Sequence, residues 1–199
     1  VSPAARPLCL LSRGESVHLV LADASGLLDV PLAPASGAPR RFFDGPPPRY
    51  PVSVVRSVTG DAFAAIDEAG ARVLVGEWGE NGPGVVACAP PPGVTLGGPC
   101  DARFDQEGRL DLFLYDAASQ ELLDLVGLPD PPQVVRVTRA HDVTAVAAVA
   151  WGGGWLYLYA ETVQGPSGGA EYSLSLLESL PGRARAVYRR LHASPVPYS

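Results

Sequence analysis

The alternation of apolar and polar side chains over Val17–Leu32 predicts a β-hairpin. From Val17 to Leu21, leucine and valine recur at every second position, which is the period of a half-buried strand. The segment Asp23–Gly26 follows, in which Asp and Ser can bond their own backbone and Gly tolerates positive φ. Apolar residues then resume and end at Pro31, which has no N–H to donate to a sheet. The stretch therefore predicts strand, tight turn and strand.

The same pattern recurs later in the chain, over Leu110–Leu128. Leu110–Asp116 repeats the spacing of Val17–Asp23, and Leu122–Asp124 repeats Leu27–Asp29 after a turn that is two residues longer. A repeat of this length predicts an internal duplication. We expect a single all-β domain over residues 1–199, with two copies at about 8–90 and 100–191.

Two all-β architectures fit the spacing of the predicted strands. The chain shows about a dozen short strands with turn signals every 8–12 residues or so, which is typical of all-β proteins. The favoured architecture has two similar tandem halves that form small packed β-barrels or curled sheets, with a short C-terminal helix at Arg183–Leu191. The alternative is a four-bladed β-propeller with strand–turn–strand units near residues 16–43, 53–87, 102–137 and 143–188.

The composition narrows the class of protein. Hydrophobic residues make up 47% of the chain, so it can bury a core. The net charge is −6, from 15 basic and 21 acidic residues, which argues against nucleic-acid binding through this segment. No apolar run approaches the roughly 18 residues of a membrane-spanning helix, so we expect no membrane partner. The absence of Lys and Met is typical of a GC-rich coding sequence.

The three cysteines leave two alternatives open. Cys88 and Cys100 flank a Pro/Gly-rich loop that a disulfide could close in an oxidising compartment, with Cys9 left over. Alternatively, all three are reduced thiols that act as small hydrophobic side chains. The chain has no Cys-x-x-Cys pair and no Cys/His cluster with zinc-ligand spacing.

No stretch of the sequence predicts an active site. The histidines lie in separate segments, and only His141 has an adjacent carboxylate, Asp142, which a strand would point to the opposite face. There is no Gly-x-Ser-x-Gly elbow, and the glycines at Gly152–Gly154 are not followed by the lysine of a phosphate-binding loop. We therefore expect a non-enzymatic protein with no catalytic residues, no metal ligands, no cofactor and no small-molecule substrate.

Two groups of side chains are candidate contact surfaces. Period 2 places Trp155, Tyr157 and Tyr159 on one face of a strand that is apolar on both faces, which predicts burial between layers or at an interface. The second group is the basic cluster of the C-terminal segment, which predicts a solvated face or a patch for an acidic partner. It comprises Arg183, Arg185, Arg189 and Arg190.

The N-terminal sequence resembles a viral regulatory family. Cys9–Arg41 and Pro47–Pro51 resemble the C-terminal dimerisation region of alphaherpesvirus immediate-early regulators of the infected-cell protein zero type, and Ala65–Gly76 resembles that region's last hairpin more loosely. The C-terminal domain of infected-cell protein four is a second family that would suit a longer, independent domain. Either resemblance implies a transcriptional regulator of the host nucleus, with self-association or a protein partner.

The sequence thus predicts a non-enzymatic interaction or dimerisation domain of a viral nuclear transcriptional regulator. The alternative is a secreted four-bladed propeller that binds a ligand or matrix protein, and this alternative predicts a Cys88–Cys100 disulfide.

Overall fold

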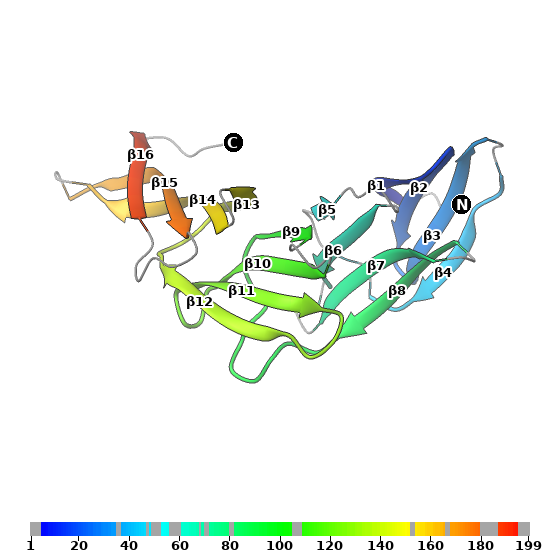
Figure 1. Ribbon diagram of the computed structural model, residues 1–199, viewed down its shortest axis with the longest axis horizontal. Coiled ribbons are helices and arrows are strands. Elements are labelled where there is room, and N and C mark those ends of the chain that lie inside the picture. Colours follow the sequence, from blue (N-terminus) through cyan, green and yellow to red (C-terminus); the bar gives the residue numbers. More distant parts are fainter. Residues whose placement is uncertain are drawn as a thin grey trace. The chain divides into compact units, whose positions relative to one another are not determined.

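The computed structural model is built from antiparallel sheets (Figure 1). It describes residues 5–34, 37–46, 48, 53–55, 61–67, 69, 72–79, 82–104, 109–151, 154–165, 168–179 and 187–194. Strands along this part of the chain form four sheets of four strands, and each sheet keeps its strands in sequence order. Each sheet is therefore a meander in which consecutive strands are hydrogen-bonded neighbours.

The first two sheets come from the N-terminal half of the chain. The first contains β1 (Arg6–Arg13), β2 (Ser16–Asp23), β3 (Gly26–Ala33) and β4 (Arg40–Asp44). The second contains β5 (Ser53–Val55), β6 (Ala62–Ile66), β7 (Val73–Gly79) and β8 (Gly82–Cys88).

The other two sheets come from the C-terminal half. The third contains β9 (Cys100–Phe104), β10 (Leu110–Asp116), β11 (Glu121–Leu128) and β12 (Gln133–Arg139). The fourth contains β13 (Ala145–Trp151), β14 (Gly154–Gln164), β15 (Ala170–Ser179) and β16 (Val187–Ser194).

The all-β class with curled sheets, rather than barrels, is confirmed, whereas the predicted C-terminal helix is wrong. None of the four sheets closes into a barrel. The segment predicted to form a C-terminal helix contributes to strand β16, where Arg189 pairs with Leu176 and Tyr188 with Leu177 of β15. The irregular spacing of Ala186, Tyr188 and Leu191 gave a helix only a weak apolar face, whereas the edge of β15 supplies a full ladder of backbone partners.

The chain divides into two compact units, Val1–Pro90 with Pro129–Pro131, and Pro91–Leu128 with Pro132–Ser199. In the first unit, Leu11, Val20 and Leu27 of the first sheet pack with Phe63 of the second, and all four are fully buried. Burial of such side chains is the main favourable term in folding, at about 1.5–3 kcal/mol each.

The second unit packs its two sheets around an aromatic core. Phe113 and Tyr115 of β10 meet Tyr157 and Tyr159 of β14, and the Phe113 and Tyr157 ring centroids are 4.6 Å apart. Every residue of β10 is buried. Such a strand, buried on both faces, requires cover on both sides, and the loop before β9 contacts its end, where the Thr95 N–H donates to Asp116.

The two hairpins of the sequence repeat have the same strand register. Val17 pairs with Ala33 and Leu19 with Val30 in the first sheet, while Leu110 pairs with Leu128 and Leu112 with Leu125 in the third. A register shift falls between these pairs in both sheets. The repeated sequence pattern therefore corresponds to a repeated backbone arrangement, including its irregularity.

Candidate functional site

The turn between β10 and β11 is organised by the buried carboxylate of Asp116. Its Oδ1 accepts hydrogen bonds from the backbone N–H of Ala118 at 2.9 Å and of Ser119 at 3.4 Å, and its Oδ2 accepts one from the N–H of Thr95 at 3.3 Å. Asp116 is 1% exposed. An Asp at the end of a strand can bond backbone groups of the turn that follows, which fixes the turn and here also ties it to the preceding loop.

A pocket of about 500 Å³ opens beside this turn. Glu121 of β11 and Arg136 of β12 form an ion pair on its wall, with the Glu121 side chain 13% exposed and the Arg136 side chain 73% exposed. Leu123, Val134 and Val135 add apolar surface to the lining. The pocket thus combines an exposed guanidinium with aliphatic side chains, a mixture that suits a peptide segment.

The pocket lies against the outer strand of the third sheet. β12 stands at the end of the strand order β12–β11–β10–β9, so one side of its backbone faces away from the sheet. Val135, in the middle of the regular part of β12, is 40% exposed. An edge strand offers a row of N–H and C=O groups to another chain. The geometry therefore brings together an outer strand of the sheet, an exposed valine and a charged pocket.

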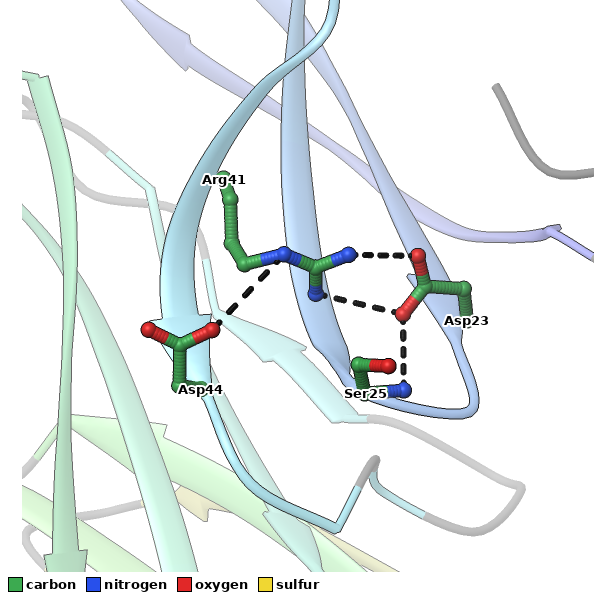
Figure 2. Close-up of polar contacts among 4 residues, drawn as sticks. All are labelled: Asp23, Ser25, Arg41 and Asp44. Atoms are coloured by element: carbon green, nitrogen blue, oxygen red, sulfur yellow. Dashed lines mark hydrogen bonds and ion pairs between the residues drawn. The ribbon is translucent and has the colours of Figure 1, made fainter.

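The first sheet carries a related pair of charges in a closed arrangement (Figure 2). Arg41 donates from Nη2 to Oδ2 of Asp23 at 2.6 Å and from Nη1 to Oδ1 at 3.1 Å, while the Ser25 N–H also donates to Oδ1 at 2.8 Å. The Arg41 Nε lies 3.7 Å from Oδ1 of Asp44. The Arg41 and Ser25 hydrogen bonds hold the pKa of Asp23 below its ordinary value of 3.8.

Arg41 and Arg136 occupy equivalent places, because Arg41 pairs with Leu28 and Arg136 with Leu123, the corresponding leucines of the two hairpins. Arg41 is held by a bidentate contact to Asp23 and is 32% exposed, whereas Arg136 is bound to Glu121 alone among the described ion pairs. Of the two guanidinium groups, that of Arg136 is the more available to a partner.

The predicted aromatic face lies inside the second unit. Tyr157 is 3% and Tyr159 2% exposed, and Trp155 is partly buried against the same core. The sequence left open whether this face is buried between layers or at an interface. In the structure, it packs between layers of the second unit. The chain itself covers Tyr157 and Tyr159, whereas Trp155 keeps part of its surface exposed.

A buried charged cluster next to this face was not predicted from the sequence. Arg103 of β9 forms an ion pair with Asp124 of β11, with side chains 6% and 4% exposed, and its guanidinium carbon lies 3.9 Å from the Trp155 ring centroid. The Tyr157 hydroxyl donates to Oδ2 of Asp124 at 3.2 Å. Among the residues that the structure describes, Arg103 Nε, Arg103 Nη1 and Asp124 Oδ1 have no hydrogen-bond partner. Burial raises the pKa of Asp124 more than Arg103 and Tyr157 lower it, and burial also raises the pKa of Tyr157.

The first hairpin has its own buried acid, Asp29, which corresponds to Asp124. Nδ1 of His18 lies 2.5 Å from Oδ1 of Asp29, and the two side chains are 14% and 3% exposed. His18 and Asp29 are eleven positions apart on different strands, so their pairing is not visible in the sequence. Strand register is the only signal that would have paired them.

The predicted basic cluster is only partly within the described residues. Arg183 and Arg185 lie outside them. Arg189 and Arg190 lie on β16 and pair with Leu176 and Ser175. The described part of the segment predicted as a helical face is thus a strand.

The described cysteines are all free thiols, so of the two alternatives the structure has reduced thiols and no Cys88–Cys100 disulfide. Burial, followed by the charge of Asp61, raises the pKa of Cys9 to about 12. Burial and Asp130 raise the pKa of Cys88. A raised pKa disfavours the thiolate, which is the nucleophilic form, at both Cys9 and Cys88.

Within the described residues, no group of three His, Cys, Asp or Glu side chains has the arrangement of a metal site. No helix in that part of the chain is long and apolar enough to span a membrane. No known protein-family model matches the sequence, and no curated protein matches it.

Proposed function

We propose that this chain is a non-enzymatic interaction module that associates with a second copy of itself. The observation that carries the proposal is the outer edge of β12, where exposed Val135 and the exposed guanidinium of Arg136 border a pocket. Proteins generally protect long, regular sheet edges, so an edge with an exposed aliphatic side chain favours a contact with another polypeptide.

The sequence resemblance extends the proposal to a biological setting. Cys9–Arg41, which resembles a dimerisation region of alphaherpesvirus immediate-early regulators, forms most of the first sheet. The resemblance supports self-association in a viral transcriptional regulator of the host nucleus. This biological setting is supported only by the sequence resemblance of Cys9–Arg41.

Light scattering of the purified 199-residue chain across a concentration series tests self-association. We expect a dimer at micromolar concentration that dissociates on dilution. A mass that stays that of the 20.7 kDa monomer at every concentration would overturn the proposal.

A second candidate function is ligand binding by a propeller-like protein. Four consecutive four-stranded meanders favour it, because a meander of this size is the unit of a propeller blade. The free thiols of Cys88 and Cys100 remove the disulfide that this candidate predicted. It predicts a chain that stays monomeric in the light-scattering series and whose thermal midpoint rises when a soluble ligand is added.

A further inference from the structure

We infer that the pocket beside the β10–β11 turn is a binding site for a small aliphatic zwitterion, an amino acid or a dipeptide. Asp116 would hold the ammonium group of this ligand and Arg136 its carboxylate, and both residues line the pocket. All of the lining residues belong to the second unit. The inference goes beyond the proposed self-association and does not depend on it, because it concerns a small molecule rather than a second polypeptide.

The two repeated hairpins arrange an equivalent Asp–Arg pair in opposite ways. Asp23 and Asp116 stand at the same place in the repeat, and so do Arg41 and Arg136. In the first sheet, Arg41 donates to both carboxylate oxygens of Asp23. In the third sheet, as far as the structure describes it, Arg136 does not bond Asp116, and the two line a pocket instead. A ligand between them is complementary when it supplies one charge of each sign.

The residue opposite the aspartate accounts for this difference. Gly26 pairs with Asp23 in the first sheet, whereas Glu121 pairs with Asp116 in the third. A glycine has no side chain that could compete for the arginine. The carboxylate of Glu121, in contrast, accepts a hydrogen bond from Nη1 of Arg136. Glu121 thus holds the guanidinium on the pocket wall and keeps it from closing onto Asp116.

Arg136 provides the site for the carboxylate of the ligand. Its side chain is 73% exposed, and within the described part of the chain its guanidinium bonds Glu121 alone, through Nη1. The opposite edge of the guanidinium, formed by Nε and Nη2, is the edge that binds a carboxylate with two parallel hydrogen bonds. Arg136 can therefore bind a carboxylate without releasing Glu121.

Asp116 and Glu121 provide the site for the ammonium group. They stand directly opposite each other, and such residues have Cβ atoms about 4.5–5.5 Å apart. The Asp116 carboxylate accepts from the N–H groups of Ala118, Ser119 and Thr95, the last at 3.3 Å. An ionised carboxylate has about four acceptor positions, so one remains for a donor of the ligand. Two carboxylates against one guanidinium also leave an excess negative charge, which an ammonium group offsets.

The rest of the lining suits an aliphatic side chain of modest size. Leu123, Val134 and Pro92 contribute apolar surface beside the charged groups. The pocket volume of about 500 Å³ lies within the range of about 300–1,000 Å³ that is usual for small-molecule sites. A free amino acid or a dipeptide with one aliphatic side chain therefore matches the pocket in charge, polarity and size.

A nuclear magnetic resonance titration of the full chain tests the inference, with leucine and glycyl-leucine as probes up to about 50 mM. The Nε–H signal of Arg136, assigned with the variant Arg136→Gln, should shift and saturate with at least one of the two probes. The Nε–H signal of Arg41 is the internal control and should not move, because Asp23 already holds that guanidinium.

Two compounds with a single charge test whether both ends of the ligand are recognised. N-acetyl-leucine lacks the ammonium group, and leucinamide lacks the carboxylate. Each should bind about tenfold more weakly than the better zwitterion, or not at all, because one charged contact is lost.

Two variants test the assigned residues. Arg136→Gln should weaken binding of the better probe about tenfold or more, whereas the matched control Arg41→Gln should leave it unchanged. Glu121→Gly reproduces the arrangement of the first sheet, so Arg136 should close onto Asp116 and binding should fall to a similar extent. Circular dichroism melts of these variants verify that each is folded. Arg136→Gln is expected to fold because the side chain is mostly exposed.

Three results would overturn the inference. The first is the absence of a saturable shift with both probes in folded wild-type protein. The second is binding of N-acetyl-leucine or leucinamide as tight as that of the better zwitterion. The third is wild-type affinity in folded Arg136→Gln. None of these results depends on the oligomeric state, so light scattering tests the proposed self-association separately.

Discussion

Phe42 and Val137 are the extra residues of two β-bulges at the same place in the first and third sheets. In β4, Phe43 pairs with Leu27 and Arg41 with Leu28, and in β12, Thr138 pairs with Leu122 and Arg136 with Leu123. Both bulged side chains pack, partly buried, against the core of their own unit. A bulge re-aims one side chain while the strand continues, so each outer strand both contacts the core and presents an arginine.

The buried pair Arg103–Asp124 should show strong energetic coupling. Arg103→Met should cost about 3–5 kcal/mol in the free energy of unfolding, because it leaves a buried carboxylate without its counter-charge. Asp124→Asn retains an acceptor for Tyr157 but leaves Arg103 uncompensated. The double variant should cost clearly less than the sum of the single variants. Urea unfolding of all four proteins, at one protein concentration, measures the coupling.

The exposed pair Arg136–Glu121 is the matched control for this double-mutant cycle. The Arg136 side chain is 73% exposed, so its coupling to Glu121 should stay below about 1 kcal/mol. Additive effects of Arg103→Met and Asp124→Asn would contradict the assignment of a buried, coupled ion pair.

Asp23 should make stability depend on pH in the acid range. Its hydrogen bonds with Arg41 and Ser25 lower its pKa below 3.8 in the folded chain. The unfolded chain therefore takes up the proton first as the pH falls. The contribution of Asp23 is fully present above the ordinary pKa and is lost as the pH falls through the lowered folded pKa.

Asp23→Asn is the variant that tests this pH dependence. Urea unfolding between pH 2 and 7 or so should show a flatter pH profile for Asp23→Asn than for wild type. Asp44→Asn is the control, because Asp44 is 86% exposed and 3.7 Å from Arg41. Identical profiles for wild type and Asp23→Asn would refute the prediction.

Gly26 should be intolerant of any side chain. Its φ is +148°, and a Cβ placed there would lie 2.0 Å from the backbone oxygen of Phe43. Gly26→Ala should therefore push β4 away from β3 and cost at least about 2 kcal/mol of the free energy of unfolding. Thermal or urea unfolding measures this loss.

Gly14→Ala separates backbone strain from steric clash. Gly14 also has positive φ, +58°, but a Cβ there would meet nothing within 4 Å. The variant Gly14→Ala should therefore cost only about 1 kcal/mol of the free energy of unfolding. Equal losses in the free energy of unfolding for Gly14→Ala and Gly26→Ala would contradict a destabilising clash between a side chain at position 26 and β4.

Cys9 should resist alkylation in the folded protein. With a pKa of about 12, only about one thiol in 10⁴ is ionised at pH 8, and the thiolate is the reactive form. Mass spectrometry after brief iodoacetamide treatment should find Cys9 unmodified in native protein and fully modified after unfolding in urea. Rapid modification of native Cys9 would contradict its burial against the core of the first unit.

The sequence alone was sufficient to predict the strands and turns of the two repeated hairpins. Alternating apolar residues such as Val17, Leu19 and Leu21 predicted strands, and Asp23–Gly26 predicted the turn, because both depend on residues close together in the chain. The correspondence of Val17–Leu32 and Leu110–Leu128 was also visible in the sequence. The structure adds that the two hairpins have the same register.

The tertiary structure decided what depends on partners far apart in the chain. Arg103 meets Asp124 and Trp155 from other strands, and His18 meets Asp29. The described part of the predicted helix, from Val187 on, belongs to β16 because β15 offers a ladder. Strand register and bulges set these contacts, and a shift of one residue would turn each side chain to the opposite face. The exposed edge at Val135 depends on the same strand order. Local pattern determined the strands, whereas long-range pairing determined which of their side chains were buried, paired or left open to a partner.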